Sequence, residues 1–188
     1  MTRVLATDDR VVIRKMSDTP TDYVLLAKWL SDPAVLEFYE GRDNPFDLKR
    51  VKAKFSPRAM GEDRVVPCIV EMNQVALGYV QFYPLDDSQR VEYGLDSQER
   101  AFGVDMFIGE PPQWGRGIGP RVLRALIRYL VRSEDAVVVT LDPQVSNGRA
   151  IRAYEKAGFT KSKVLPKHEM HEGELRDCLL MVWRAAAP

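Results

Sequence analysis

The 188-residue chain has few cysteines and no long apolar segment. Its two cysteines, Cys68 and Cys178, lie far apart and form neither a CxxC pair nor a spacing typical of metal ligands. No apolar run approaches the roughly 20 residues that a helix needs to cross a bilayer. The N-terminal segment lacks an apolar signal core and contains acidic side chains. We therefore expect a cytoplasmic protein with reduced thiols and no membrane contact.

The chain also lacks an excess of either charge, because 27 basic and 27 acidic residues give a net charge of zero. A nucleic-acid partner would favour a basic excess, so none is expected. A cationic partner requires acidic residues that gather locally. With 45% hydrophobic and 29% charged residues, the composition is typical of a globular protein. We expect one domain over residues 1–188, with an ordered core at about 11–184.

Hydrophobic periodicity predicts a mixed α/β sheet flanked by helices. Two β-rich runs flank the short turn Asn73-Gln74, which predicts an antiparallel hairpin. The run at 136–141 is apolar except for Thr140, as in a buried parallel strand. The expected elements in chain order are a strand at 11–14, helices beginning after Thr19 and Asp47, strands at 65–72, 75–83 and 102–108, a helix that runs to about 132, a strand at 136–141, a helix at 147–157 and a strand at 179–183, with residues 84–100 as a loop.

A glycine-rich turn, QWGRGIG at residues 113–119, opens directly onto an amphipathic helix. Glycines allow several backbone N–H groups to point at one oxyanion, and the helix N-terminus adds the positive end of its dipole. Pro120 removes one N–H group after the turn, and those of residues 116–119 remain. The spacing matches neither the dinucleotide motif nor the P-loop. The turn therefore predicts a pyrophosphate site for a cofactor other than a metal-bound nucleoside triphosphate.

Asp105 lies inside the apolar strand at 102–108. Alternation places Val104, Met106 and Ile108 on one face of that strand and Asp105 with Phe107 on the other. Apolar neighbours disfavour the ionised form, so we expect the pKa of Asp105 to rise toward working pH. A carboxylate of that kind suits a general base that accepts a proton from an ammonium group. A buried Asp bonded to backbone N–H groups is the structural alternative.

Several motifs together resemble the GCN5-related N-acetyltransferase (GNAT) superfamily. They are the turn at 113–119, Asp142-Pro143 after a strand, and the run NGRAIRAYEKAGF at 147–159. Within that superfamily the chain is most similar to the aminoglycoside 6′-N-acetyltransferases, above all to the acetyltransferase half of the bifunctional acetyltransferase–phosphotransferase resistance enzymes. This similarity covers about residues 11–184 and includes WLSD at 29–32, VLEFYEGRD at 35–43, FIGEP at 107–111, and HEMHEG at 168–173 with Asp177-Cys178.

The resemblance implies a single GNAT-type domain whose two parallel strands splay to admit acetyl-CoA, the cosubstrate. The backbone of the glycine turn would hold the pyrophosphate, and an amide near Phe107 would polarise the thioester carbonyl. Asn147 would bond to the pantetheine arm, although its position also suits a helix N-cap. The cofactor-binding residues implied in this way are Phe107, Ile108, Arg116, Gly117, Ile118, Gly119, Arg121 and Asn147.

The resemblance also assigns catalytic and substrate-binding roles. Asp105 matches the proposed base and amine anchor, and Tyr154 matches the acid that protonates the departing CoA thiolate. A tyrosine hydroxyl has a pKa near 10 and donates a proton without being ionised at rest, although by pattern alone Tyr154 suits a core position. Acidic residues and an aromatic wall would bind a cationic aminoglycoside. The expected substrate-binding residues are Tyr39, Phe55, Asp63, Asp105, Asp142, Glu172 and Asp177.

The implied activity is acetylation of an aminoglycoside at its 6′-amine by direct transfer from acetyl-CoA, which would confer antibiotic resistance. Two alternatives stay open from the residues. One is another small-amine acyltransferase, such as a siderophore hydroxylysine N-acetyltransferase, and the other is a non-catalytic acyl-CoA-binding module. His168 and His171 lack further ligand partners in the sequence, so no metal is expected.

Overall fold

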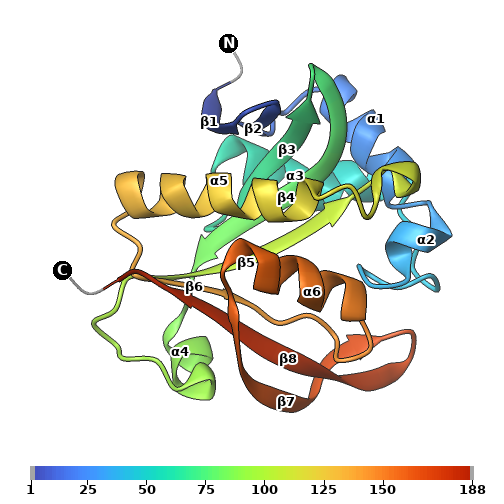
Figure 1. Ribbon diagram of the computed structural model, residues 1–188. Coiled ribbons are helices and arrows are strands. Elements are labelled where there is room, and N and C mark those ends of the chain that lie inside the picture. Colours follow the sequence, from blue (N-terminus) through green and yellow to red (C-terminus); the bar gives the residue numbers. More distant parts are fainter. Residues whose placement is uncertain (1–2, 187–188) are drawn as a thin grey trace.

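The computed structural model describes residues 3–186 and contains one eight-stranded mixed sheet (Figure 1). Its strand order is β1-β2-β3-β4-β5-β6-β8-β7. Neighbouring strands are antiparallel except β5 and β6, which are parallel. The strands are β1 (Val4–Asp8), β2 (Val11–Lys15), β3 (Val66–Met72), β4 (Val75–Pro84), β5 (Ala101–Ile108), β6 (Val138–Leu141), β7 (Thr160–His171) and β8 (Glu174–Arg184).

Local sequence signals explain where the main elements begin and end. Asn73 and Gln74 have φ values of 50° and 66°, the left-handed pair that a two-residue hairpin turn requires between β3 and β4. Asp47 caps the second of the predicted helices, α3 (Leu48–Met60) in the structure, by accepting a hydrogen bond from the Arg50 N–H at 2.7 Å. The helices are α1 (Pro20–Trp29), α2 (Pro33–Leu36), α3 (Leu48–Met60), α4 (Asp87–Tyr93), α5 (Ile118–Ser133) and α6 (Gly148–Ala157), and a short 3₁₀ turn η1 covers Pro111–Gln113.

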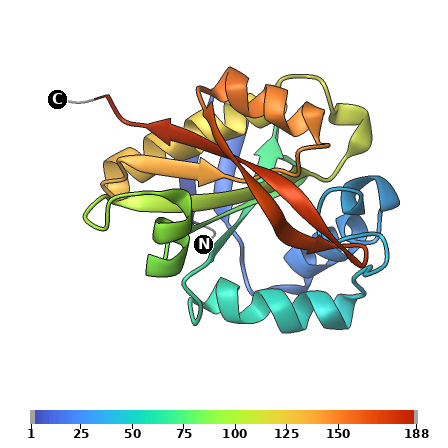
Figure 2. The same cartoon turned by 90° about the horizontal axis from the view of Figure 1, so that it is seen from below.

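Helices cover both faces of the sheet (Figure 2). One face carries α5 and α6, and its core includes Val104 of β5, with Met106 and Ile108 packed beside it. The other face carries α1 and α3, and its core includes Phe107. The predicted alternation of β5 is therefore confirmed. No helix within residues 3–186 is long and apolar enough to cross a membrane.

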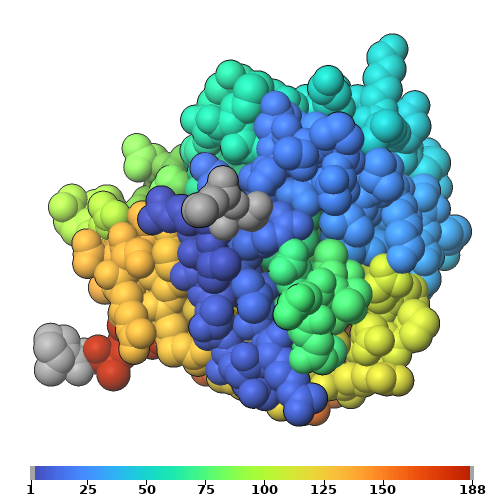
Figure 3. All heavy atoms as spheres, turned by 90° about the horizontal axis from the view of Figure 1, so that it is seen from above, coloured from blue at the N-terminus to red at the C-terminus, as the bar shows by residue number. Residues whose placement is uncertain are grey.

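Besides the short turn η1, the structure adds four elements to those expected, namely β1, α2, α4 and β7. Strand β1 precedes the expected ordered core and packs beside α5 (Figure 3). Helix α4 lies in the segment expected to be a loop, where Asp86 and Gln89 form a capping box. Strand β7 is an edge strand whose residues are mostly exposed, so it lacks the apolar alternation that predicts a strand.

The β7–β8 hairpin reaches across to the segment that follows α2 (Figure 2). His171 Nε2 donates to the Glu37 carbonyl at 2.9 Å, and Arg42 forms a two-pronged ion pair with Glu172 at 2.6 and 2.8 Å. Segments that are far apart in the sequence thereby enclose one end of the sheet, beside the carboxyl ends of β5 and β6.

Candidate active site

The parallel strands β5 and β6 separate in the middle of the sheet. Their pairing ends at Gly103 and Thr140, while β5 continues to Ile108 paired only with β4. The half of β5 that has no partner on the β6 side borders a cavity of about 760 Å³. Asp105, Phe107 and Tyr154 line this cavity. The splayed pair therefore opens a groove at the centre of the fold, where the resemblance expects the pantetheine arm.

The glycine turn forms one end of this cavity. Gly115 and Gly117 have φ values of 77° and 74°, which residues with a side chain rarely adopt. Helix α5 begins immediately after Gly117, and Pro120 is its third residue, where an N–H group would have no partner inside the helix. Within residues 3–186, the N–H groups at 115–119 make no hydrogen bond to a protein acceptor. These free donors at a helix N-terminus fit a pyrophosphate group.

The arginine side chains of this turn and of the first turn of α5 lie outside the main cavity. Arg116 and Arg121 border a second hollow of about 320 Å³ rather than the main cavity. Arg121 Nη1 forms an exposed ion pair with Asp9 Oδ2 at 3.0 Å. A role for either side chain in binding a cofactor phosphate stays a prediction.

Asn147 combines a capping position with a place on the cavity wall. Its Oδ1 accepts a hydrogen bond from the Ala150 N–H at 3.1 Å at the start of α6. Asn147 also borders the cavity, as do Ile108, Ile118 and Gly119. The structural role of the side-chain oxygen is therefore observed, and the bond to pantetheine stays a prediction.

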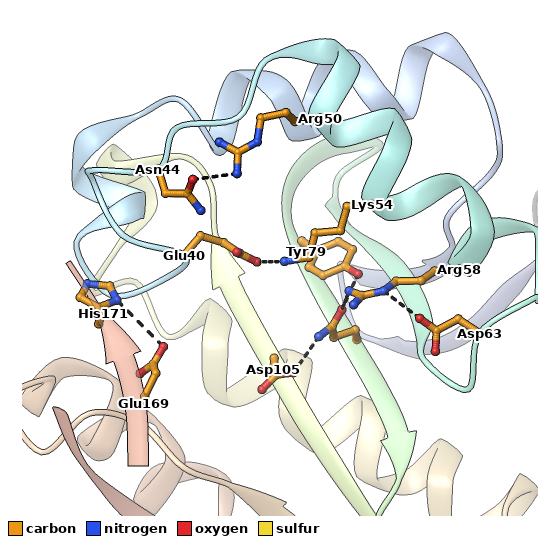
Figure 4. Close-up of polar contacts among 11 residues, drawn as sticks. Glu40, Asn44, Arg50, Lys54, Arg58, Asp63, Tyr79, Asp105, Glu169 and His171 are labelled. Atoms are coloured by element: carbon orange, nitrogen blue, oxygen red, sulfur yellow. Dashed lines mark hydrogen bonds and ion pairs between the residues drawn. The ribbon is translucent and has the colours of Figure 1, made fainter. Parts of the chain in front are cut away.

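Asp105 lies on the cavity wall in a largely buried environment. Gln81 of β4 pairs with it across the strands and donates from Nε2 to Asp105 Oδ2 at 2.7 Å (Figure 4). Burial and the nearby Asp142 carboxylate raise the pKa of Asp105 to about 6, while hydrogen bonds from Gln81 and Tyr83 oppose that rise. The predicted upward shift is confirmed. A carboxylate with this pKa is ionised at neutral pH and still basic enough to accept a proton.

Two tyrosines complete the walls around Asp105. Tyr154 of α6 is 8% exposed and borders the cavity. Burial, followed by the Asp105 and Asp142 charges, raises the pKa of Tyr154, so its hydroxyl stays protonated at neutral pH. Tyr39 also borders the cavity and packs edge-on against Phe107, with ring centroids 4.7 Å apart.

Asp142, just after β6, is held by two side chains. Its Oδ2 accepts from the Tyr93 hydroxyl at 3.0 Å and lies 2.9 Å from His168 Nε2. His168 Nδ1 lies 3.0 Å from Glu92 Oε1. The hydrogen bond to Asp142 is the main cause that raises the pKa of His168. His168 thus helps to hold the carboxylate of Asp142 in place.

Four of the expected substrate-binding residues lie outside this cavity. Phe55 is fully buried and packs edge-on against Tyr79, because the apolar face of α3 covers the sheet. Each of the three acids is held by another partner away from the cavity wall. Asp63 forms an ion pair with Arg58, Glu172 pairs with Arg42, which lowers the pKa of Glu172 to about 2, and Asp177 accepts from the Lys167 N–H.

Other residues border the cavity without having been expected there. Glu169 of β7 does so and accepts a hydrogen bond from Gln144 Nε2 at 3.1 Å. The HEMHEG motif contains both His168 and Glu169, so this motif was the available signal. Gln81 and Tyr83 had no such signal, since each belongs to an ordinary strand pattern. Within residues 3–186, no cluster of three or more His, Cys, Asp or Glu residues is placed to hold a metal ion.

A groove between splayed parallel strands, closed by a glycine turn at a helix N-terminus, defines an acyl-CoA-binding transferase of the α/β class. A family model described as "Acetyltransferase (GNAT) domain" matches residues 18–166. The chain belongs to the GNAT acetyltransferase family, and it is an acetyl-CoA-dependent N-acetyltransferase.

Three individual proteins show which members of the family this chain is similar to. Aminoglycoside N(6′)-acetyltransferase type 1 of Klebsiella pneumoniae is 30% identical over 158 residues, which cover 84% of this chain and 78% of that protein. N5-hydroxyornithine acetylase sidL of Beauveria bassiana is 23% identical over 147 residues, or 77% of this chain and 26% of that protein. The crystal structure of aminoglycoside acetyltransferase AAC(6′)-Ib with coenzyme A and kanamycin is 26% identical, covers 93% of this chain and 94% of its own, and has a TM-score of 0.72.

Proposed function

We propose that this enzyme acetylates the 6′-amine of aminoglycosides. The observation that carries the proposal is a single cavity. The glycine turn at 113–119 lines one part of it, and the carboxylates of Asp105, Asp142 and Glu169 line another. Carboxylates bind ammonium groups through charge-assisted hydrogen bonds, so this lining suits a polycationic sugar. The 30% identity to an aminoglycoside N(6′)-acetyltransferase supports the same substrate class.

Acetyl-CoA supplies an acetyl group on a thioester, whose carbonyl carbon is open to attack by an amine. In our proposal the backbone N–H groups at 115–119 hold the pyrophosphate, and the edge of β5 that β6 leaves free positions the pantetheine arm. An unpaired N–H of residues 107–108 polarises the thioester carbonyl. These contacts leave the reacting carbon near the two proposed catalytic side chains.

Asp105 and Tyr154 then divide the proton transfers. Asp105, with a pKa near 6, accepts the proton of the bound ammonium group and so frees the amine for attack. Tyr154 keeps its proton at neutral pH and donates it to the departing sulfur. Transfer is direct in a ternary complex, without an acyl-cysteine, since burial raises the pKa of both Cys68 and Cys178 to about 12.

Asp142, Glu169 and Tyr39 bind the rest of the substrate in this proposal. The two carboxylates pair with ammonium groups of the sugar, and Tyr39 supplies an apolar wall. Acetylation removes one positive charge and adds bulk to the antibiotic, so the expected consequence in the cytoplasm of a bacterial cell is resistance. We also propose that the whole chain forms one catalytic domain.

The experiment measures CoA release by the purified protein with acetyl-CoA and a panel of acceptors: kanamycin, spermidine and N5-hydroxyornithine. We expect the highest kcat/KM with kanamycin. A higher kcat/KM with hydroxyornithine would replace the aminoglycoside with a hydroxylated amino acid as the substrate. Binding of acetyl-CoA without turnover of any acceptor would favour a non-catalytic module.

A further inference from the structure

Gln81 lies next to the proposed base, Asp105, on the neighbouring strand β4. It pairs with Asp105 in the β4–β5 ladder, so both side chains leave the same face of the sheet. Gln81 is 7% exposed and donates from Nε2 to Asp105 Oδ2 at 2.7 Å. Its amide oxygen accepts from the Tyr79 hydroxyl at 2.8 Å and from Arg58 Nη1 at 3.0 Å (Figure 4). Each polar end of this buried amide therefore has a partner.

The identity of these partners fixes which way the amide points. A guanidinium has only donors, so the Gln81 atom that faces Arg58 must be the oxygen. A reversed amide would place Nε2 against the Arg58 donors and Oε1 against a carboxylate oxygen, and both contacts would be repulsive. Arg58 is itself held by Asp63 through Nε and Oδ2 at 3.3 Å. Asp63, expected at the substrate, thus belongs to a chain of contacts that leads to Asp105.

Because Tyr79 and Arg58 fix the orientation of the Gln81 amide, its N–H donor has two effects on the Asp105 carboxylate. It engages one carboxylate oxygen and so limits rotation of the group on the cavity wall. It also favours the ionised form of Asp105, against the effect of burial and of the Asp142 charge. The other titratable or charged groups that act on Asp105 are Tyr79 and Tyr83 of β4, Arg58 of α3, Tyr39, and Tyr154 of α6.

We propose that Gln81 is a positioning residue for Asp105: its amide, oriented by Tyr79 and Arg58, holds the carboxylate in place and ionised so that it can accept a proton. This inference rests on the proposed base role of Asp105. The proposal also gives β4 a part in positioning the base, whereas its sequence pattern predicts only a strand of the sheet.

The test replaces Gln81 with Met, which has a similar length and no N–H donor. The primary readout is the pKa of Asp105, measured by ¹³C NMR titration of the side-chain carboxyl in the protein without substrate. Loss of a hydrogen bond to a charged group should raise this pKa by about one pH unit or more. Tyr79→Phe keeps the buried ring and removes one of the two donors to Gln81, so it should raise the pKa by less.

Gln144→Met is the matched control. Gln144 is also buried, at 6% exposed, and donates to a different cavity carboxylate, Glu169. This variant should leave the pKa of Asp105 unchanged. If Gln81→Met does not fold, Tyr79→Phe still decides the question, because an unchanged Asp105 pKa in that folded variant would overturn the locking role. An unchanged Asp105 pKa in folded Gln81→Met would overturn the whole proposal.

The kinetic readout separates this inference from the proposed function. The acid limb of kcat/KM against pH should move upward in Gln81→Met by the same amount as the NMR value. If the NMR pKa moves while the kinetic limb stays in place, Gln81 still sets the ionisation of Asp105, but Asp105 is not the catalytic base. The NMR result needs no turnover, so it also stands if no aminoglycoside is a substrate.

Discussion

Replacing Gly117 with Ala tests whether the backbone of the glycine turn holds the cofactor. Gly117 has φ 74° and ψ 12°, and an added Cβ would meet no atom within 4 Å, so the change introduces backbone strain without a clash. The left-handed conformation costs an L-residue about 1–2 kcal/mol. For a chain of this size that cost lowers Tm by roughly 2–8 °C.

The chain offers a matched control in Gly61, the C-cap of α3. Gly61 has φ 81° and ψ 23°, and its Cβ would also meet nothing within 4 Å, but it lies outside the cavity lining. Gly61→Ala should therefore lower Tm to a similar extent. The difference between the two variants should appear in cofactor binding and not in stability.

The binding difference follows from the free donors of the turn. Strain at Gly117 turns the following N–H groups away from the pyrophosphate, and loss of one hydrogen bond to a charged group costs about 1.5–3 kcal/mol. CoA should then bind at least about 10-fold more weakly, measured by calorimetry, whereas Gly61→Ala should bind it as the parent protein does. Unchanged CoA affinity in Gly117→Ala would refute the proposal that the glycine turn binds the pyrophosphate. An equal loss of CoA affinity in Gly61→Ala would show that destabilisation alone weakens binding.

Three further predictions concern the catalytic residues. Asp105→Asn should lower kcat by about 10²–10⁴-fold while CoA affinity is retained, because only the proton acceptor is lost; a rate within a few-fold of the parent's would exclude Asp105 as the base. In the parent enzyme kcat/KM should rise with pH through an apparent pKa near 6 and level off above it, because the ionised form of Asp105 is the active one; a flat profile between pH 5 and about 8 would contradict this assignment. Tyr154→Phe should lower kcat with little change in the KM for acetyl-CoA, and an unchanged kcat would place Tyr154 in the core only.

The sequence was most informative where local chemistry determines structure. The turn at Asn73-Gln74, the Asp47 cap and the apolar run before Asp142 each act over a few residues, and the structure has the hairpin, α3 and β6 at these places. The alternation of β5 likewise placed Asp105 and Phe107 on one face of the sheet. Hydrophobic and capping patterns were sufficient for these features.

The missed parts depend on contacts between distant segments. Phe55 has the spacing of an apolar helix face, and that spacing does not distinguish a core position from a cavity wall. Tyr93 and His168 converge on Asp142 from α4 and β7, two elements whose polar, exposed sequences do not predict a helix or a strand. Glu172 looks like a free acid until Arg42 is brought beside it by the β7–β8 hairpin. Such pairings cannot be predicted from local sequence patterns, because the partners lie far apart in the sequence and meet only in the folded chain.

The most direct test of the proposed activity compares two aminoglycosides that differ at one position. CoA release is measured with kanamycin, which carries the 6′-amine, and with an analogue that carries a 6′-hydroxyl, and the kanamycin product is located by NMR. We predict rapid turnover of kanamycin with the acetyl group on the 6′-nitrogen, and little turnover of the hydroxyl analogue. Acetylation at another amine, or equal turnover of both compounds, would contradict the account.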